Sequence, residues 1–345
     1  MNYVFIDEAQ LLEDWQQVAN ALRLMGKVDV YLTGSNAYMF SGDLANFFGG
    51  RYIEIKMQPF SFKEYIAAYE QFALFTSKET LSNAFSNENS LQRIYEKYVK
   101  ESGFPQTARL HGNRQLINDY LMDTVYLNTI HKDIIQRFGI SDKGRFDAVV
   151  RFMFDNIGNE TSVRGIERGL KAAGNGMAIA TLTNYIQCLL DSYLMYKCDR
   201  YDIKGKQFLN ANSKYYAVDI GLRTALLGHE DADMGRALEN IVYLELLRRG
   251  FRVYVGIIKT KQVKINDKIE RKTIEVDFLA QKSGGEREYY QVALYALASE
   301  ETLRRELASL EEIDDNYPKF LLTMDPGSGE NKGIKRLNVL EWLAD

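Results

Sequence analysis

The chain has 345 residues, 46% hydrophobic and 26% charged, which is typical of a globular protein and more than one comfortable core can hold, so we expect about two to four domains. A formal net charge of −4 and a pI of about 5.7 argue against a protein that coats nucleic acid through its overall field. Two cysteines are too few for a disulfide framework or a four-ligand zinc site, and the sequence has no membrane-spanning or signal-peptide pattern, so we expect a cytoplasmic protein without a membrane partner.

Residues 1–60 alternate between strand and helix patterns. Apolar runs at 3–6 and 28–32 predict two strands, and residues 11–24 have the spacing of a helix. Unbroken apolar strands are typical of parallel sheets that helices cover. We therefore expect this segment to be part of an α/β sheet domain.

The first predicted strand ends in two adjacent carboxylates, Asp7 and Glu8. In a nucleoside-triphosphate hydrolase such a strand supplies an aspartate to the magnesium ion and a glutamate that polarises the attacking water. Taken alone, the pair is better explained as the acidic start of a helix, where the helix dipole favours carboxylates. The Thr-Gly-Ser-Asn sequence at 33–36, after the second strand, is by itself an ordinary turn.

Residues 61–144 are expected to form a helical linker or lid, because aromatic and apolar side chains recur there at helical spacing. Residues 145–228 read as three helices followed by two strands, which is the order of a winged helix-turn-helix. Helices are predicted over 146–157, over 162–173 and from 181 onward, and strands over 194–201 and 207–218.

The winged-helix pattern predicts DNA as a partner. Its cations would meet phosphates, and the polar side of its third helix would read base edges. The cations are Arg164, Arg168, Lys204 and Lys206, and the polar residues are Thr181, Thr183, Asn184 and Gln187. That helix has no basic residue from 181 to 190. Such a module can equally bind a protein partner or a second copy of the chain, because fold does not establish function.

Residues 229–345 read as a separate α/β domain. Helices are predicted over 237–249 and 301–310, and strands over 251–258, 274–280, 289–295 and 320–323.

An ordered set of short motifs resembles the prokaryotic AAA-type ATPase family that carries a DUF4143 C-terminal region. The matching segments are Tyr3-Val-Phe-Ile-Asp-Glu-Ala-Gln10, Leu32-Thr-Gly-Ser-Asn36, Gly50-Arg51, Pro59-Phe-Ser-Phe-Lys-Glu-Tyr65, Ser102-Gly-Phe-Pro105, Tyr215-Tyr-Ala-Val-Asp-Ile-Gly-Leu222, Glu239-Asn240 and Glu275-Val-Asp277. The resemblance implies ATP and Mg²⁺ as cofactors in the full-length family. It also implies that Asp7 supports the metal, Glu8 orients the water, Asn36 senses the terminal phosphate, and Arg51 serves transition-state charge or domain movement.

The family's phosphate-binding loop has no counterpart, since no G-x-x-x-x-G-K-[ST] sequence occurs. Triphosphate affinity depends mainly on that nest of backbone N–H groups and its lysine. We therefore expect little or no ATP bound by this chain alone. We also expect that Met1 lies inside a longer protein, giving a truncated module, or that it starts a degenerate member of the family.

The last region resembles a PD-(D/E)xK nuclease fold. The resemblance implies a site made of Glu239, Glu275, Asp277 and Gln291, with a metal at Asp277. Gln291 stands where an acid is usual, and Ala293 replaces the lysine two residues later. We therefore expect a degenerate site, unless another lysine moves in.

The sequence thus predicts a multidomain chain of mixed α/β and α class. Its parts are a partial AAA-like parallel sheet at 1–60, a helical region at 61–144, a winged helix at 145–228 and a nuclease-like α/β domain at 229–345. The predicted function is that of a regulatory, interaction or DNA-associated protein of the ATPase family that does not hydrolyse ATP alone. The alternative is a metal-dependent nuclease.

Overall fold

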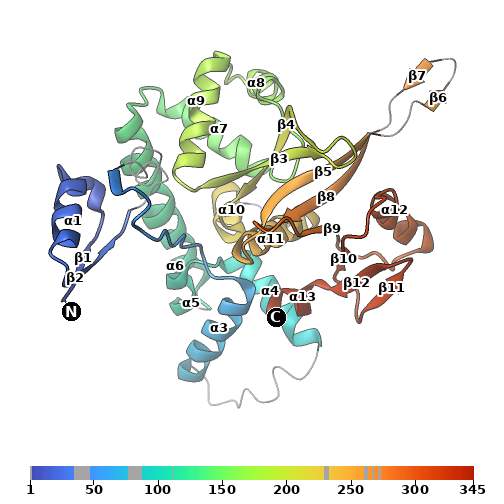
Figure 1. Ribbon diagram of the computed structural model, residues 1–345, viewed down its shortest axis with the longest axis horizontal. Helices are drawn as coiled ribbons and strands as arrows, with labels where there is room; N and C mark the ends of the chain where they lie inside the picture. The colour runs from blue at the N-terminus through green and yellow to red at the C-terminus, as the bar shows by residue number, and fades with distance from the viewer. Residues whose placement is uncertain are drawn as a thin grey trace.

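The computed structural model describes residues 2–34, 47–76, 88–110, 112–228, 233–259, 263–265, 268–270 and 273–345 (Figure 1). Its helices are α1 (Trp15–Leu24), α3 (Phe62–Thr76), α4 (Glu88–Glu101), α5 (Pro105–Arg109), α6 (Arg114–Asp119), the π-helical η4 (Tyr120–Tyr126) and η5 (Thr129–Gln136), α7 (Lys143–Asp155), α8 (Val163–Ala172), α9 (Ile179–Asp191), α10 (Ile220–Leu227), α11 (Met234–Arg248), α12 (Glu300–Glu311) and α13 (Val339–Ala344). Its strands are β1 (Asn2–Ile6), β2 (Val28–Leu32), β3 (Met195–Asp202), β4 (Gln207–Ala217), β5 (Arg252–Lys259), β6 (Val263–Ile265), β7 (Lys268–Glu270), β8 (Thr273–Gln281), β9 (Arg287–Ala293), β10 (Lys319–Thr323), β11 (Gly329–Asn331) and β12 (Ile334–Asn338). The expected mixture of α/β and α structure is confirmed.

The N-terminal strands β1 and β2 pair in parallel, from Asn2 opposite Val28 to Ile6 opposite Leu32, as the sequence predicts. The helix that follows β1 starts later than expected, at residue 15 instead of 11. Glu8 and Asp14 both take the left-handed backbone conformation, and a 3₁₀ turn, η1 (Ala9–Leu11), lies between them. These two reversals interrupt the helical pattern until residue 15.

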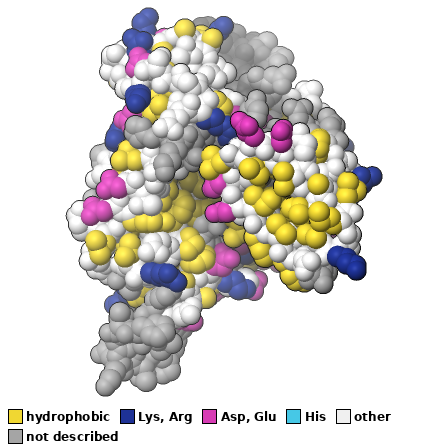
Figure 2. Space-filling view, turned by 90° about the vertical axis from the view of Figure 1, so that its left-hand side faces the viewer, with side chains coloured by type: hydrophobic (Ala, Val, Ile, Leu, Met, Phe, Trp, Pro, Cys, Tyr) yellow, Lys and Arg dark blue, Asp and Glu magenta, His cyan; other side chains and the backbone are white. Residues whose placement is uncertain are grey.

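One face of this small sheet is covered and the other is open. Trp15, Ala19 and Phe48 form a small core beneath the strands. Phe5 is 74% exposed and stacks on Tyr31, with ring centroids 4.8 Å apart. Figure 2, which turns this side of the molecule toward the viewer, shows hydrophobic side chains gathered on the surface.

The segment predicted to be helical consists of helices joined by short turns where it is described, from α3 to η5. Its aromatic side chains interlock at the predicted spacing. Phe62 of α3 contacts Tyr95 of α4 with ring centroids 5.7 Å apart, and Tyr65 contacts Tyr98 at 5.1 Å. These rings belong to the main hydrophobic core, which extends into the C-terminal half.

The order of three helices and two strands is also found, in α7, α8, α9, β3 and β4. Ser162 caps α8 by accepting the Gly165 N–H at 3.0 Å, as expected. The third helix begins at Ile179, two residues before the prediction. Whether these elements act as a winged helix is not established by their order.

The two strands of this region lie in the same sheet as the C-terminal strands. The sheet has eight strands in the order β11-β12-β10-β9-β8-β5-β3-β4. β3 joins it by parallel pairing with β5, with Arg200 opposite Val255. The sheet therefore runs across the domain boundary drawn at residue 228, and the separate domains stay predictions. Local patterns gave no sign of this pairing, because it joins segments about fifty residues apart.

Two helices cover opposite faces of this sheet. Adjacent residues point to opposite faces of a strand, and Tyr289 and Tyr290 of β9 lie in different cores. The Tyr290 core includes side chains of α11, and the Tyr289 core includes Leu307 and Leu310 of α12. The sequence did not predict the short elements β6, β7, β11, β12 and α13.

A buried aspartate joins the helical region to α10. Asp219, 4% exposed, accepts the Gly103 N–H at 2.8 Å and the Leu222 N–H at 2.7 Å. Gly221 lies directly against this joint, because a Cβ there would come 2.3 Å from the backbone nitrogen of Ser102. The close approach leaves no space for a side chain.

We predict that Gly221→Ala lowers the free energy of unfolding by about 1–3 kcal/mol, because the added methyl meets backbone atoms that no rotamer change can move. Chemical denaturation of both proteins measures the difference. Gly284→Ala is the matched control, since a Cβ at Gly284 has no atom within 4 Å, and its effect should stay within about 0.5 kcal/mol. Equal loss in both variants would contradict the close-packed joint.

Candidate functional site

The carboxyl ends of β1 and β2 form one candidate site at the edge of the small parallel sheet. Asp7 and Glu8 follow β1 there, and Thr33 follows β2. The Thr33 hydroxyl donates to Asp7 Oδ1 at 2.5 Å and accepts the Glu8 backbone N–H at 3.0 Å. The register that pairs Ile6 with Leu32 places these groups side by side. One hydroxyl thus fixes both acidic positions.

Of the two other residues assigned to this site by sequence, only Arg51 is described by the structure. Asn36 lies outside the described residues. Arg51 is exposed, and within residues 2–34 and 47–76 no hydrogen bond or ion pair joins its guanidinium to Asp7 or Glu8. Thr33, which the sequence indicated only as part of a turn, is the neighbour of both acids. Its position directly after an apolar strand was the available signal.

A second candidate site surrounds a buried lysine in the eight-stranded sheet. Lys214 Nζ of β4 lies 2.8 Å from Glu239 Oε1, 2.8 Å from Glu275 Oε1 and 3.9 Å from Asp277 Oδ1. Glu239 comes from α11 and the other two acids from β8. Only 6% of the lysine side chain is exposed. We call these four side chains the lysine–carboxylate cluster.

Burial and neighbouring charges set the protonation of the cluster. Burial alone would lower the pKa of Lys214, but Glu239, Asp277 and Glu275 raise that pKa above its usual value, so the ammonium stays charged. Burial, reinforced by Glu239, raises the pKa of Asp277 to about 8 against the opposing effect of Lys214. Asp277 therefore keeps its proton to a higher pH than a surface aspartate does.

Neutral side chains orient the acids of the cluster. The Tyr216 hydroxyl donates to Glu239 Oε1 at 2.6 Å, and the tyrosine is fully buried. Gln291 of β9 accepts two hydrogen bonds at Oε1, from the Asp277 backbone N–H at 3.4 Å and from Ser309 Oγ at 3.0 Å. The Gln291 oxygen is therefore already engaged inside the protein.

The structure places the four nuclease-like positions together at this point: Glu239, Glu275, Asp277 and Gln291. Their catalytic roles stay predictions. Sequence reasoning missed Lys214 and Tyr216, because both lie in β4, which was assigned to another domain. The expected lysine is absent at Ala293, and the lysine found beside the acids comes from β4 instead. A lysine within the otherwise apolar end of a strand was the only local signal.

The cluster does not fit the metal site that a nuclease-like fold implies. Glu239 Oε1 already accepts from Lys214 and Tyr216, and Asp277 Oδ2 accepts the Val292 N–H at 2.8 Å. A hard divalent cation needs carboxylate oxygens that face it, and here an ammonium lies among them. In the part of the chain that the structure describes, no group of three or more His, Cys, Asp or Glu side chains could hold a metal ion. We therefore assign no metal-dependent step to Asp277.

The predicted phosphate-binding cations differ in whether they form an ion pair. Arg164 and Arg168 are exposed on α8, one turn apart. Lys206 is exposed in the turn between β3 and β4, whereas Lys204 forms an ion pair of 3.7 Å with Glu312. Lys204 is therefore partly neutralised.

The predicted base-reading residues differ in whether their polar groups form hydrogen bonds within α9. The Thr183 hydroxyl donates to the Ile179 carbonyl at 2.9 Å, and Gln187 donates to Asp191 at 2.8 Å. Both polar groups are thus engaged within α9 itself. Thr181 and Asn184 are exposed.

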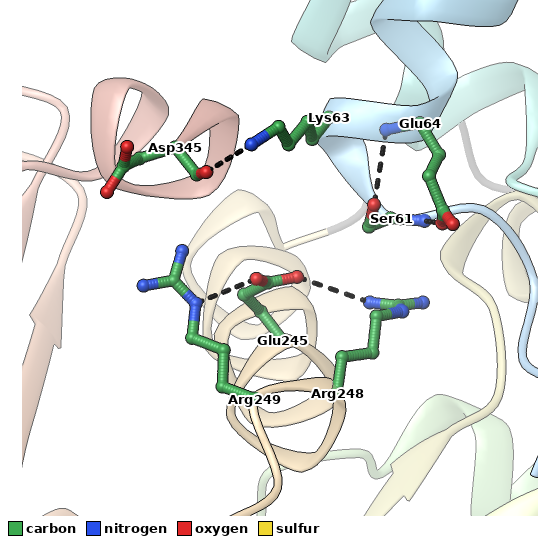
Figure 3. A pocket seen from close by; sticks show the side chains of 7 residues that line it. All are labelled: Ser61, Lys63, Glu64, Glu245, Arg248, Arg249 and Asp345. Atoms are coloured by element: carbon green, nitrogen blue, oxygen red, sulfur yellow. Dashed lines mark hydrogen bonds and ion pairs between the residues drawn. The ribbon is translucent and has the colours of Figure 1, made fainter.

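A polar pocket of about 480 Å³ lies at the far end of α11 from Glu239 (Figure 3). It is lined by Ser61, Lys63, Glu64, Glu245, Arg248, Arg249 and Asp345. Glu245 lies between the two arginines, accepting from Arg249 Nε at 2.8 Å. Arg248 also donates to the Pro59 carbonyl at 2.9 Å. The pocket therefore lies where the chain leaves the N-terminal segment.

We predict that Tyr216→Phe lowers the free energy of unfolding by about 1.5–3 kcal/mol, because the lost hydroxyl bonds a charged group in a buried position. Tyr243→Phe is the matched control. Tyr243 is equally buried and stacks on Tyr216 at 4.3 Å, but its hydroxyl has only a 3.4 Å contact with the Lys197 carbonyl, so the loss should be about 1 kcal/mol or less. Denaturant melts of both variants make the comparison, and equal losses would show that Tyr216 contributes only packing.

Comparison with known proteins identifies the N-terminal segment and the relatives of the whole chain. Residues 1–66 match the family described as an AAA domain, and residues 92–233 match a domain of unknown function, DUF8612, which replaces the expected DUF4143. An uncharacterized protein of Methanocaldococcus jannaschii, MJ1544, is 27% identical over 339 residues, covering 97% of this chain and 70% of the relative.

An uncharacterized protein of Haemophilus influenzae is 36% identical over 343 residues, covering 99% of this chain and 77% of the relative. Among the described residues, no helix has the length and apolar character needed to cross a membrane. Because the Haemophilus likeness extends over nearly the whole chain and the first 66 residues match an AAA domain, the chain belongs to the family of that protein, a family of the AAA type.

Proposed function

We propose that this protein is a regulatory or interaction protein of the AAA type, which does not hydrolyse ATP alone. The observation that carries the proposal is the Thr33 hydroxyl, which joins Asp7 and the Glu8 backbone at the carboxyl end of a parallel strand pair. This is the edge of an α/β sheet at which ligands bind.

The residues at this edge fit the metal-and-water half of a nucleotide site. Asp7 is exposed and has one carboxylate oxygen beyond the one bonded to Thr33. Magnesium in such sites takes one or two protein carboxylates and keeps several waters. Asp7 would therefore support the ion, which would supply neutralisation of phosphate charge. The Glu8 side chain, which accepts from Gln10, would orient the water.

The triphosphate grip is the part that the chain does not supply. The 345 residues contain no G-x-x-x-x-G-K-[ST] loop. The Asp7 carboxylate and the Thr33 hydroxyl carry no N–H group, whereas fixed N–H groups are what hold phosphates in such loops. We infer that nucleotide chemistry at Asp7 depends on phosphate-binding groups outside these residues. By itself, the protein would function by binding a partner.

We predict that the protein shows no saturable binding of a fluorescent ATP analogue with Mg²⁺ at micromolar concentration, and no phosphate release above the buffer rate, because nothing grips the triphosphate. Asp7→Asn should behave identically in both assays. Turnover by the unaltered protein that disappears in Asp7→Asn and Glu8→Gln would overturn the proposal, while assigning the two carboxylates their roles.

DNA association is a second candidate function, favoured by one observation. Arg164, Arg168 and Lys171 are all exposed on α8, at spacings of four and three residues, so they share one helix face. A row of cations on a helix can follow a phosphate backbone without reading sequence.

We predict that Arg164→Glu combined with Arg168→Glu weakens duplex DNA binding and lowers the slope of log affinity against log salt by about two, since each phosphate contact contributes about one. Fluorescence anisotropy at several salt concentrations measures both quantities. Arg304→Glu with Arg305→Glu on the exposed helix α12 changes the net charge equally and is the control. Equal weakening by both pairs would exclude a specific role for α8.

A further inference from the structure

We propose that the ammonium of Lys214 takes the place of a divalent cation in the C-terminal sheet, and that it keeps the lysine–carboxylate cluster free of metal. The inference concerns a different part of the molecule from the proposed nucleotide edge and does not depend on it. The cluster contains the acids that a nuclease-like fold uses for metal, yet the cation among them belongs to the protein.

The ammonium fits the position well. It is a compact charge with three N–H donors, and three carboxylates surround it, at 2.8, 2.8 and 3.9 Å. The lysine stem emerges from β4 and is almost completely buried, so the ammonium cannot move into water without a rearrangement of the strand. A metal ion entering from solvent would have to displace a cation that is covalently tethered in place.

Two of the three acids are also held by contacts that do not involve Lys214. Glu239 accepts from the Tyr216 hydroxyl, and Asp277 accepts from the Val292 backbone N–H. Gly158 faces Glu239, and a Cβ there would lie 3.5 Å from Glu239 Oε2. If the ammonium is removed, the protein therefore keeps two oriented carboxyl groups without a counter-charge. Mg²⁺ and Mn²⁺ can bind through one or two carboxylates and complete their coordination with water.

With the tethered cation in place, the site has the acids of a nuclease-like fold but not the metal chemistry of one. A divalent ion acts by polarising phosphoryl oxygens and activating water, both of which require open coordination positions. The ammonium offers no coordination position, and it lies 2.8 Å from an oxygen of Glu239 and 2.8 Å from an oxygen of Glu275. The cluster thus neutralises and positions its carboxylates without metal chemistry.

The test compares binding of Mn²⁺ by the intact protein and by Lys214→Met, using equilibrium dialysis and thermal melting. Mn²⁺ should leave the melting temperature of the unaltered protein unchanged. Lys214→Met should melt at a lower temperature without metal and regain stability as Mn²⁺ saturates one site. Its Mn²⁺ affinity should exceed that of the unaltered protein by at least about tenfold.

Three variants assign the gain to this cluster. Lys214→Arg retains a cation and should gain no site. Adding Asp277→Asn to Lys214→Met should abolish the gain, whereas adding Asp7→Asn should leave it intact, which separates the cluster from the N-terminal edge. Where Lys214→Met does not fold, Lys214→Gln serves in its place.

Two results would overturn the proposal. One is stoichiometric Mn²⁺ binding by the unaltered protein that Asp277→Asn removes, because the cluster would then accept metal with Lys214 present. The other is a folded Lys214→Met or Lys214→Gln variant that binds no more Mn²⁺ than the unaltered protein.

Discussion

The charge balance around Lys214 constrains the whole C-terminal half. Three acidic side chains brought close together lose hydration, and any two that are ionised repel each other, so a cation of fixed position stabilises the arrangement. The lysine supplies it from β4, while the acids come from α11 and β8. The ion pairs therefore tie the edge of the eight-stranded sheet to a central strand and to the helix that covers them.

The helix α11 extends this constraint toward the N-terminal segment. Glu239 lies in its first half, and Arg248, its last residue, donates to the Pro59 carbonyl at 2.9 Å. The next residue, Phe60, donates to the Gly103 carbonyl at 2.6 Å, and the Gly103 N–H reaches Asp219. The chain leaving the small parallel sheet is thus held by backbone contacts to both the helical region and α11. These contacts end on α11, the helix that also carries Glu239 of the lysine–carboxylate cluster.

The sequence predicted the parts of this structure that depend on local pattern. The strands β1 and β2, the helices α7 and α8 with the Ser162 cap, and the acids at the end of β1 follow from apolar runs, helical spacing and capping chemistry. The contact of Lys214 with Glu239 could not be predicted in that way, because it depends on β3 pairing with β5 across a predicted domain boundary. Because β3 and β4 were interpreted as a self-contained hairpin, the pairing of β3 with β5 was not predicted. The acids were visible in sequence, but the group that decides their chemistry lies on a strand distant in the chain.

The two acidic sites differ in what they lack, and this difference favours a role in binding. At the N-terminal edge, Asp7 is exposed and its oxygens could meet a metal, but the described residues around it offer no grip for a triphosphate. In the cluster, Asp277 is buried and the two glutamates are partly buried, but the protein's own ammonium already lies among them. Catalysis needs both an oriented ligand set and an open position for the reacting group, and each site has only one of these. Two exposed surfaces are accessible to a partner: the aromatic face of β1 and β2 and the cationic face of α8. The proposed role as an interaction protein depends on these two surfaces.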